Sequence, residues 1–184
     1  MHKKYLQEIY DAIEQCVLIR DGKVESDYEE IMSILVEVFA KQRRSHDNRT
    51  YFIGNGGSAA IAIHMTADFL KNGRMTTVGM YDAATLTCLG NDYGYEYVFS
   101  KQLEMLAQSG DLLGAISSSG NSKNIINAIN MAHERKAKVL TLTGFKTDNQ
   151  AKQLGDYNLY VPSMEYGIVE SIHNLILQQV VDSL

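Results

Sequence analysis

Two short polar turns carry the residue types best suited to hold an anion. Ile116-Ser117-Ser118-Ser119-Gly120-Asn121-Ser122 ends the apolar run from Leu112 and opens a helical pattern. Gly54-Asn55-Gly56-Gly57-Ser58 follows the strand-like Thr50–Ile53. A helix that starts after such a turn presents free backbone N–H groups and the positive end of its dipole, which favour an anion. We interpret the pair as a site for a phosphorylated ligand, although either turn alone also suits a simple helix cap.

A dinucleotide site is the main alternative for the glycine-rich turn. Gly54 to Ala59 fits the G-x-G-x-x-A pattern, and Asp82 ends the next strand, where a ribose-binding acid is expected. Asp82 lies 28 residues after Gly54, however, and the fingerprint prefers a spacing of about 20. A dinucleotide also leaves the hydroxyl-rich turn without a role. We therefore expect a monophosphate and no nucleotide cofactor.

Several titratable residues interrupt the helical patterns near these turns. His64 and Asp68 are four residues apart, so they share one helix face. Glu170, His173 and Gln178 break the apolar pattern of the last helix. Carboxylates and imidazoles near a phosphate pocket allow proton transfer or metal binding. The simpler interpretation is that they are surface residues, or polar groups whose hydrogen bonds are made inside an interface.

The bulk composition narrows the class of protein. With 184 residues, 45% hydrophobic and 21% charged, the chain is expected to form one globular domain, residues 1–184. The net charge of −5, with only the short basic run Lys41 to Arg44, argues against a nucleic-acid partner. Cys16 and Cys88 form neither a disulfide framework nor a thiolate metal motif. Without a signal peptide or an apolar run of membrane-spanning length, the expected location is the cytoplasm, with no membrane partner.

The hydrophobic periodicity predicts an α/β fold preceded by helices. Residues 1–45 are expected to be helical, because Leu6, Ile9, Ile13 and Val17 repeat at helical spacing, and Asp21-Gly22 is interpreted as a break before a second helix. Strands are predicted at Thr50–Ile53, Thr76–Met80, Asp111–Ile116, Lys138–Thr143 and Asn158–Val161. Helices are predicted at Ala59–Leu70, Ala83–Leu89, Glu96–Gln108, Asn121–Arg135, Asn149–Leu154 and Gly167–Leu184. This alternation is typical of a parallel sheet with both faces covered.

Four motifs, in their order and spacing, resemble the phosphoheptose isomerases, a family of sugar-isomerase (SIS) domain proteins. They are Gly54-Asn55-Gly56-Gly57-Ser58, Gly90-Asn91-Asp92-Tyr93-Gly94, Ile116 to Ser122, and Leu140-Thr141-Leu142-Thr143-Gly144. The resemblance implies a five-stranded parallel sheet in a flavodoxin- or Rossmann-like three-layer sandwich. It also implies a cytoplasmic homotetramer, with sites between subunits and the N-terminal helices at the interfaces. The implied reaction interconverts sedoheptulose 7-phosphate and a heptose 7-phosphate.

The resemblance assigns roles to individual residues. The hydroxyl groups expected to hold the phosphate belong to Ser58, Ser117, Ser118, Ser119 and Ser122. Asn55 and Asp92 are expected to face the sugar chain, with Gly56 of the same turn also against the substrate. In some family members the equivalents of His64, Asp68, Glu170 and Gln178 bind zinc, so zinc is a candidate cofactor here.

The chain departs from the family where proton transfer takes place. Asp68 replaces a glutamate, Gln178 replaces a histidine, and Gly167 to Ser171 replaces Asp-Arg-Ile-Gln-Glu. The family's arginine becomes Asn72, with Arg74 close by. An amide cannot exchange protons near neutral pH as an imidazole does.

Two hypotheses follow from these departures. In the first, Asp68 and Glu170 form the acid–base pair that moves a proton between C1 and C2, because two nearby carboxylates separate their pKa values. Their carboxyl groups must then lie within about 8 Å of each other to reach the same two carbons. In the second, the chain is a non-catalytic SIS domain that binds a sugar phosphate or a protein partner, as relatives that associate with the replication initiator do. We also expect Glu170 and the Ser117–Ser122 loop of one site to come from different chains of the tetramer.

Overall fold

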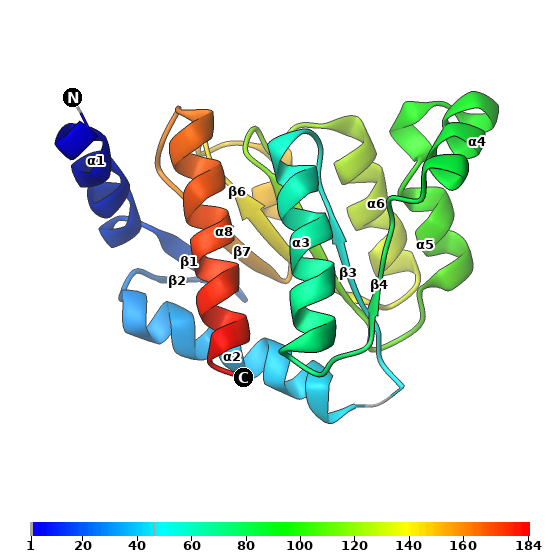
Figure 1. The fold of residues 1–184 in the computed structure, drawn as a ribbon, viewed down its shortest axis with the longest axis horizontal. Helices are drawn as coiled ribbons and strands as arrows, with labels where there is room; N and C mark the ends of the chain where they lie inside the picture. The colour runs from blue at the N-terminus through cyan, green and yellow to red at the C-terminus, as the bar shows by residue number, and fades with distance from the viewer. Residues whose placement is uncertain (1, 46) are drawn as a thin grey trace.

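A seven-stranded sheet organises the protein, as the computed structural model shows for residues 2–45 and 47–184 (Figure 1). The strand order is β2-β1-β7-β6-β5-β3-β4. The strands are β1 (Val17–Arg20), β2 (Lys23–Glu25), β3 (Thr50–Ile53), β4 (Thr77–Val78), β5 (Leu112–Ser117), β6 (Lys138–Thr143) and β7 (Tyr157–Tyr160). The helices are α1 (His2–Glu14), α2 (Tyr28–Arg44), α3 (Gly57–Lys71), α4 (Ala83–Tyr93), α5 (Ser100–Leu106), α6 (Lys123–Glu134), α7 (Gln150–Leu154) and α8 (Tyr166–Asp182), with a 3-10 turn at Tyr95–Tyr97.

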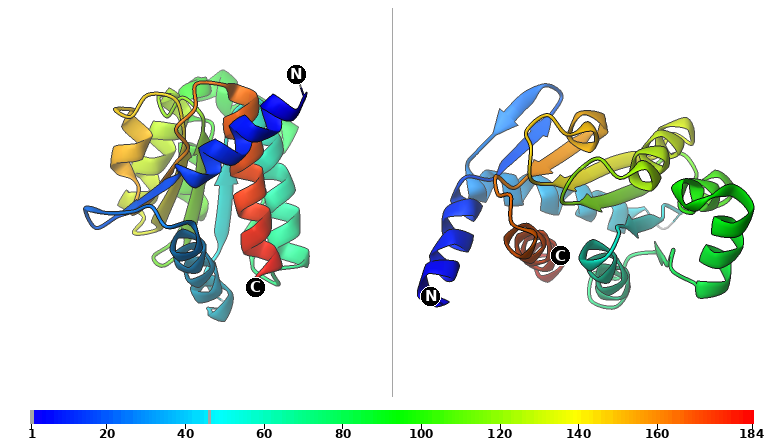
Figure 2. Two further views of the ribbon diagram at one scale, coloured as in Figure 1. Left: turned by 90° about the vertical axis from the view of Figure 1, so that its left-hand side faces the viewer. Right: turned by 90° about the horizontal axis from the view of Figure 1, so that it is seen from above.

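The five strands from β3 to β7 are parallel, which confirms the predicted three-layer α/β fold. Side chains of successive strand residues enter opposite layers. Phe52 packs with α2, α3 and α8, whereas Tyr51 and Ile53 pack with α5, α6 and α7. In the same way, Ile116 joins the first core and Ala115 the second. Figure 2 shows α3 and α8 on one face of the sheet and α6 on the other. The near-continuous apolar strands are explained by burial on both faces.

The expectation of a five-stranded sheet and an all-helical segment 1–45 is wrong. Val17 does not continue the first helix but begins β1, which pairs antiparallel with β2 and with β7. Asp21 and Gly22 form the two-residue connection, both with positive φ, 52° and 72°. This is the backbone that a tight hairpin requires, and glycine adopts it without strain. Leu18, buried at 1% exposure, secures the hairpin to the core.

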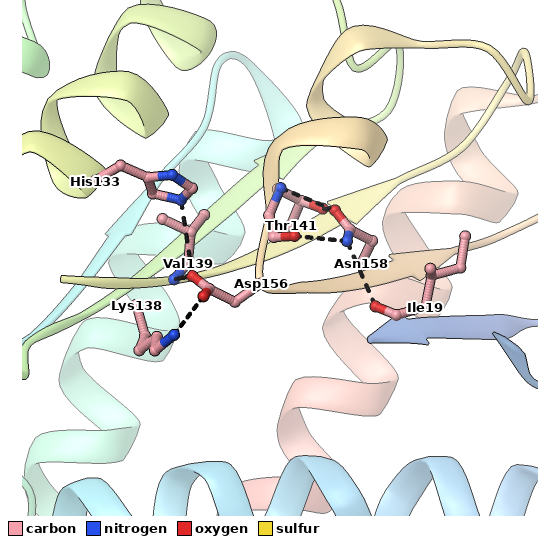
Figure 3. A network of polar contacts seen from close by, with 8 residues as sticks. Ile19, His133, Lys138, Val139, Thr141, Asp156 and Asn158 are labelled. Carbon is pink, nitrogen blue, oxygen red and sulfur yellow. Dashed lines mark hydrogen bonds and ion pairs between the residues drawn. The ribbon is translucent and has the colours of Figure 1, made fainter. Parts of the chain in front are cut away.

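Polar side chains attach the hairpin to the parallel sheet (Figure 3). The amide of Asn158 donates to the carbonyl of Ile19 at 3.4 Å, and its oxygen accepts from the Thr141 hydroxyl at 2.8 Å. The carboxylate of Asp156, the residue before β7, accepts hydrogen bonds from Lys138 Nζ at 2.6 Å and from the Val139 N–H at 2.9 Å. Because these bonds join β1, β6 and β7, the antiparallel addition is a fixed part of the sheet.

The remaining predicted elements lie close to the observed ones. The predicted helix Glu96–Gln108 divides into the 3-10 turn Tyr95–Tyr97 and α5, with Val98 and Phe99 buried between them. Helix α4 extends four residues beyond its predicted end, to Tyr93, and none of its residues is buried. Within the described residues, no helix is long and apolar enough to cross a membrane.

His173 fastens α8 to the sheet from inside the core. The ring is fully buried, and its Nε2 lies 3.2 Å from the carbonyl oxygen of Thr143, the last residue of β6. Burial lowers the pKa of His173 from 6.5 to about 4, against the smaller opposing effect of the Thr143 carbonyl. The ring is therefore neutral in the folded protein at neutral pH.

This burial makes folding stability depend on pH. Below pH 6.5 the unfolded chain protonates His173 while the folded chain does not, so the free energy of unfolding falls as the pH drops from 6.5 to about 4. The contribution of this single group is about 3 kcal/mol over that range. Urea unfolding of wild type and of His173→Gln at successive pH values measures it. Between pH 6.5 and 4 the free energy of unfolding should fall more steeply with decreasing pH in wild type than in His173→Gln. Parallel plots of the free energy of unfolding against pH would contradict the assignment.

Candidate functional site

The two polar turns meet at the carboxyl ends of neighbouring strands. From β3 the chain forms β4 on one side, and it then crosses to form β5 on the other side of β3. In parallel sheets, this reversal of direction leaves a crevice outside the carboxyl ends of the strands, where ligands bind. A pocket of about 360 Å³ lies there. Its lining residues are Asn55, Gly56, Gly57, Ser58, Ile116, Ser117, Ser118, Ser119, Ser122, Tyr166 and Glu170.

The first turns of α3 and α6 supply donors for an anion. Within the described chain, neither Gly56 before α3 nor Ser122 before α6 makes a side-chain cap to the helix that follows. Three other helices are capped in this way, because Asp27, Asp82 and Asn149 accept from backbone N–H groups at 2.8–2.9 Å. The N-terminal N–H groups of α3 and α6 therefore remain available at the pocket.

Serine hydroxyls add further polar groups to the pocket. The five serines expected at the phosphate and Asn55 and Gly56 of the glycine turn all line the pocket. Ser58, Ser117 and Ser118 are buried at 3–5% exposure. The Oγ of Ser118 has no hydrogen-bond partner among the described residues. A buried hydroxyl without a partner is costly, so a ligand in this pocket that accepts a hydrogen bond would be stabilised.

Glu170 approaches this pocket from the second turn of α8. Its carboxylate lies against the backbone of Gly57, so closely that a Cβ at position 57 would overlap it. Glycine leaves room for this close approach, which places the carboxylate beside the first turn of α3, where a negative charge is favourable. Among the described lining residues, Glu170 is the only charged one.

Glu170 and the Ser117–Ser122 loop of the same chain share this pocket. The expectation that they come from different chains is therefore wrong for this pocket. The reason is that α8 packs beside α3, with both helices starting at the carboxyl edge of the sheet (Figure 1).

Asp68 lies elsewhere on α3. Its carboxylate is 3.6 Å from Nε2 of His64, and it is not among the lining residues. Asp68 follows Gly57 by 11 residues, and a rise of 1.5 Å per residue carries it about 16 Å along the helix. A single chain therefore does not bring the Asp68 and Glu170 carboxyl groups within the 8 Å separation expected of an acid–base pair.

The four zinc-ligand candidates do not assemble within one chain. His64 and Asp68 lie together on α3, while Glu170 contacts Gly57. Gln178 donates from Nε2 to the carboxylate of Asp182 at 3.1 Å. Among residues 2–45 and 47–184, no three His, Cys, Asp or Glu side chains are close enough to hold a metal ion. The donor set of one chain does not fit zinc.

Asp92, expected at the sugar chain, is exposed on α4 and does not line the pocket. It accepts from Nδ2 of its neighbour Asn91 at 2.9 Å. His173, which shares a helix face with Glu170, turns into the core instead. The pocket of one chain therefore combines the phosphate residues with Glu170 and leaves Asp68, Asp92 and His64 outside its lining.

Two tyrosines at the site were not predicted. Tyr166, the first residue of α8, lines the pocket and packs edge-on against Phe145 with ring centroids 4.7 Å apart. Tyr81 donates to the Gly54 carbonyl at 2.8 Å and accepts from its N–H at 2.7 Å. Burial raises the pKa of Tyr81 far above 10, so its hydroxyl remains a donor. Neither tyrosine lies in a sequence motif that indicates such a role.

Known proteins are similar to this chain in sequence and in fold. The sequence model of the SIS domain matches residues 23–144. The phosphoheptose isomerase of Aliarcobacter butzleri (strain RM4018) is 39% identical over 142 residues, covering 74% of this chain and 75% of that protein.

Solved structures agree over the full length. The phosphoheptose isomerase of Neisseria gonorrhoeae superposes with a TM-score of 0.78 at 31% identity, covering 99% of this chain and 98% of the other. That of Francisella tularensis gives a TM-score of 0.79 at 28% identity, covering 98% and 94%. Sequence and fold agree that the chain belongs to the phosphoheptose isomerase family of SIS-domain proteins.

Proposed function

We propose that this protein is a cytoplasmic sugar-phosphate isomerase that interconverts sedoheptulose 7-phosphate and the corresponding aldose phosphate. The observation that carries the proposal is the pocket that joins two uncapped helix N-termini and buried serine hydroxyls to the carboxylate of Glu170. The donors suit a phosphate group, and the carboxylate can accept a proton from a carbon of the open-chain sugar. The similarity to proteins named phosphoheptose isomerases supports this choice.

The reaction moves a proton between C1 and C2 of the substrate. Glu170 acts as the base at these carbons, and a second carboxyl group exchanges a proton with the oxygens on C1 and C2. We assign this second role to Asp68. Because Asp68 of the same chain lies about 16 Å along α3 from the pocket, the Asp68 that serves a pocket belongs to a neighbouring chain.

The outer faces of α3 and α8 favour such a neighbour. Ile63 and Leu70, on α3 like His64 and Asp68, are 51% and 56% exposed, and Leu175 on α8 is 40% exposed. Helix α1, which buries only Ala12, presents further exposed apolar residues, Tyr5, Leu6 and Tyr10. Large exposed apolar surfaces mark protein interfaces. We propose a homotetramer in which these faces pack together and carry Asp68 to the pocket of a partner.

Substitution of the two carboxylates tests the chemistry. Glu170→Gln and Asp68→Asn should each lower kcat by at least about a hundredfold, with a smaller change in KM, since general acid–base catalysis contributes about 10²–10⁴-fold. Glu165→Gln, at an exposed position before the same helix, is the matched control and should keep wild-type kcat. Aldose formation from sedoheptulose 7-phosphate is the assay, with fructose 6-phosphate as a second ketose. Unchanged kcat in Glu170→Gln would refute the assigned base.

The same assay addresses the non-catalytic alternative. A protein whose melting temperature rises with sedoheptulose 7-phosphate, but which converts no ketose phosphate, is a binding domain and not an isomerase. The exclusion of Asp68 from the pocket of its own chain is the observation that favours this alternative.

Mixing inactive subunits tests the shared site. If Glu170 and Asp68 of one site come from different chains, mixed Glu170→Gln and Asp68→Asn subunits should regain about one quarter of the sites. A mixture of Glu170→Gln with Ser119→Ala is the control, because these residues line one pocket of one chain and no intact pocket can form. Recovery in the control but not in the first mixture, or a fully active monomer by light scattering, would contradict the arrangement.

Metal removal tests the role of zinc. Two carboxylates suffice for the proposed proton transfer, so this mechanism does not require a metal. Dialysis against EDTA should leave kcat/KM within about twofold of its starting value. A tenfold loss that Zn²⁺ restores would show that His64, Asp68 and Glu170 assemble a zinc site between chains.

A further inference from the structure

Hydrogen bonds from two other side chains fix the side chain of Asn55. Asn55 and Asn124 are joined by two reciprocal amide bonds, each 2.9 Å long. The hydroxyl of Tyr95 donates to the same Asn55 oxygen at 2.8 Å. These partners come from distant parts of the chain, the first turn of α6 and the 3-10 turn after α4.

The bonds decide which group Asn55 can offer to a ligand. An amide oxygen has two lone pairs, and its nitrogen carries two N–H groups. Both lone pairs of Asn55 Oδ1 are used, by Asn124 and Tyr95, and one N–H is used by Asn124. One N–H remains on a residue that lines the pocket. Asn55 is therefore left as a donor and not as an acceptor.

The backbone of the turn is held as firmly as the side chain. Tyr81 bonds both the N–H and the carbonyl of Gly54, the residue before Asn55. Asn124 is 3% exposed and does not line the pocket, so it acts on a ligand only through Asn55. Tyr95 is 62% exposed, so its hydroxyl can be removed by substitution without disturbing the core.

We propose that Tyr95 and Asn124 are positioning residues, which hold Asn55 so that its free N–H donates to an oxygen of the sugar chain. The inference rests on the proposed function, because it assigns the serine turn to the phosphate and Asn55 to the sugar. Tyr95 and Asn124 thereby contribute to the recognition of a sugar phosphate over phosphate alone.

Tyr95→Phe tests the proposal, with Tyr97→Phe in the same 3-10 turn as the matched control. Loss of one hydrogen bond of about 1 kcal/mol corresponds to about fivefold in affinity. Titration calorimetry of Tyr95→Phe should show Kd for sedoheptulose 7-phosphate raised about fivefold and Kd for inorganic phosphate unchanged. Tyr97→Phe should change neither value. In the turnover assay, KM of Tyr95→Phe should rise more than kcat falls.

A double-mutant cycle separates positioning from a direct contact. In an Asn55→Ala background, Tyr95→Phe should have no further effect on Kd for the sugar phosphate, because the residue through which it acts is gone. An additive effect there, an unchanged Kd in the single variant, or equal weakening of inorganic phosphate would each overturn the inference while the isomerase activity stands. If wild type binds no sugar phosphate, the proposed function and this inference fail together.

Discussion

The backbone N–H groups at the starts of α3 and α6 need partners, and the site is built around this need. Both helices begin beyond the carboxyl ends of adjacent parallel strands, the edge of the sheet at which the pocket lies. Side-chain caps satisfy the corresponding groups of α2, α4 and α7. The described lining residues of the pocket include no lysine or arginine, so the proposed binding of an anion relies on the backbone donors of α3 and α6 and on hydroxyl groups. The glycines of the two turns leave room for a ligand near these N–H groups, and the serines add hydroxyl groups.

Much of the sheet could be predicted from the sequence because its strands are short, apolar and separated by helical patterns. Thr50–Ile53 and Lys138–Thr143 have the observed bounds. The N-terminal hairpin was missed because Val17 continues the spacing of Leu6, Ile9 and Ile13, so the apolar pattern suggested one helix. Asp21-Gly22 was interpreted as a break between helices, although an Asp-Gly pair is also a strong signal for a two-residue hairpin. The antiparallel addition then follows from pairing with β7, which no local pattern indicates.

Part of the candidate site, like part of the sheet, could be predicted from the sequence. Each turn directly follows a strand, and the two strands, β3 and β5, are parallel neighbours, so the turns meet at one edge of the sheet. The place of Glu170 depends instead on how α8 packs beside α3, which fixes its neighbour at Gly57. Spacing along one helix shows that Asp68 shares a face with His64 and lies far from the first turn of α3, but not where the carboxylate of Glu170 lies. Tyr95 and Asn124 contact Asn55 through long-range contacts that propensity and periodicity do not describe.

Gly57 and Glu170 form a pair of positions that constrain each other sterically. Any side chain at position 57 would displace the Glu170 carboxylate while leaving the α3 backbone in place, because the overlapping atoms lie at the end of a flexible side chain. The absent methyl group thus sets how deeply the carboxylate enters the pocket. A Gly57→Ala substitution would therefore be accommodated by a rotation of the Glu170 side chain. The position of this negative charge can thus be adjusted from α3 by a single substitution, without any change on α8.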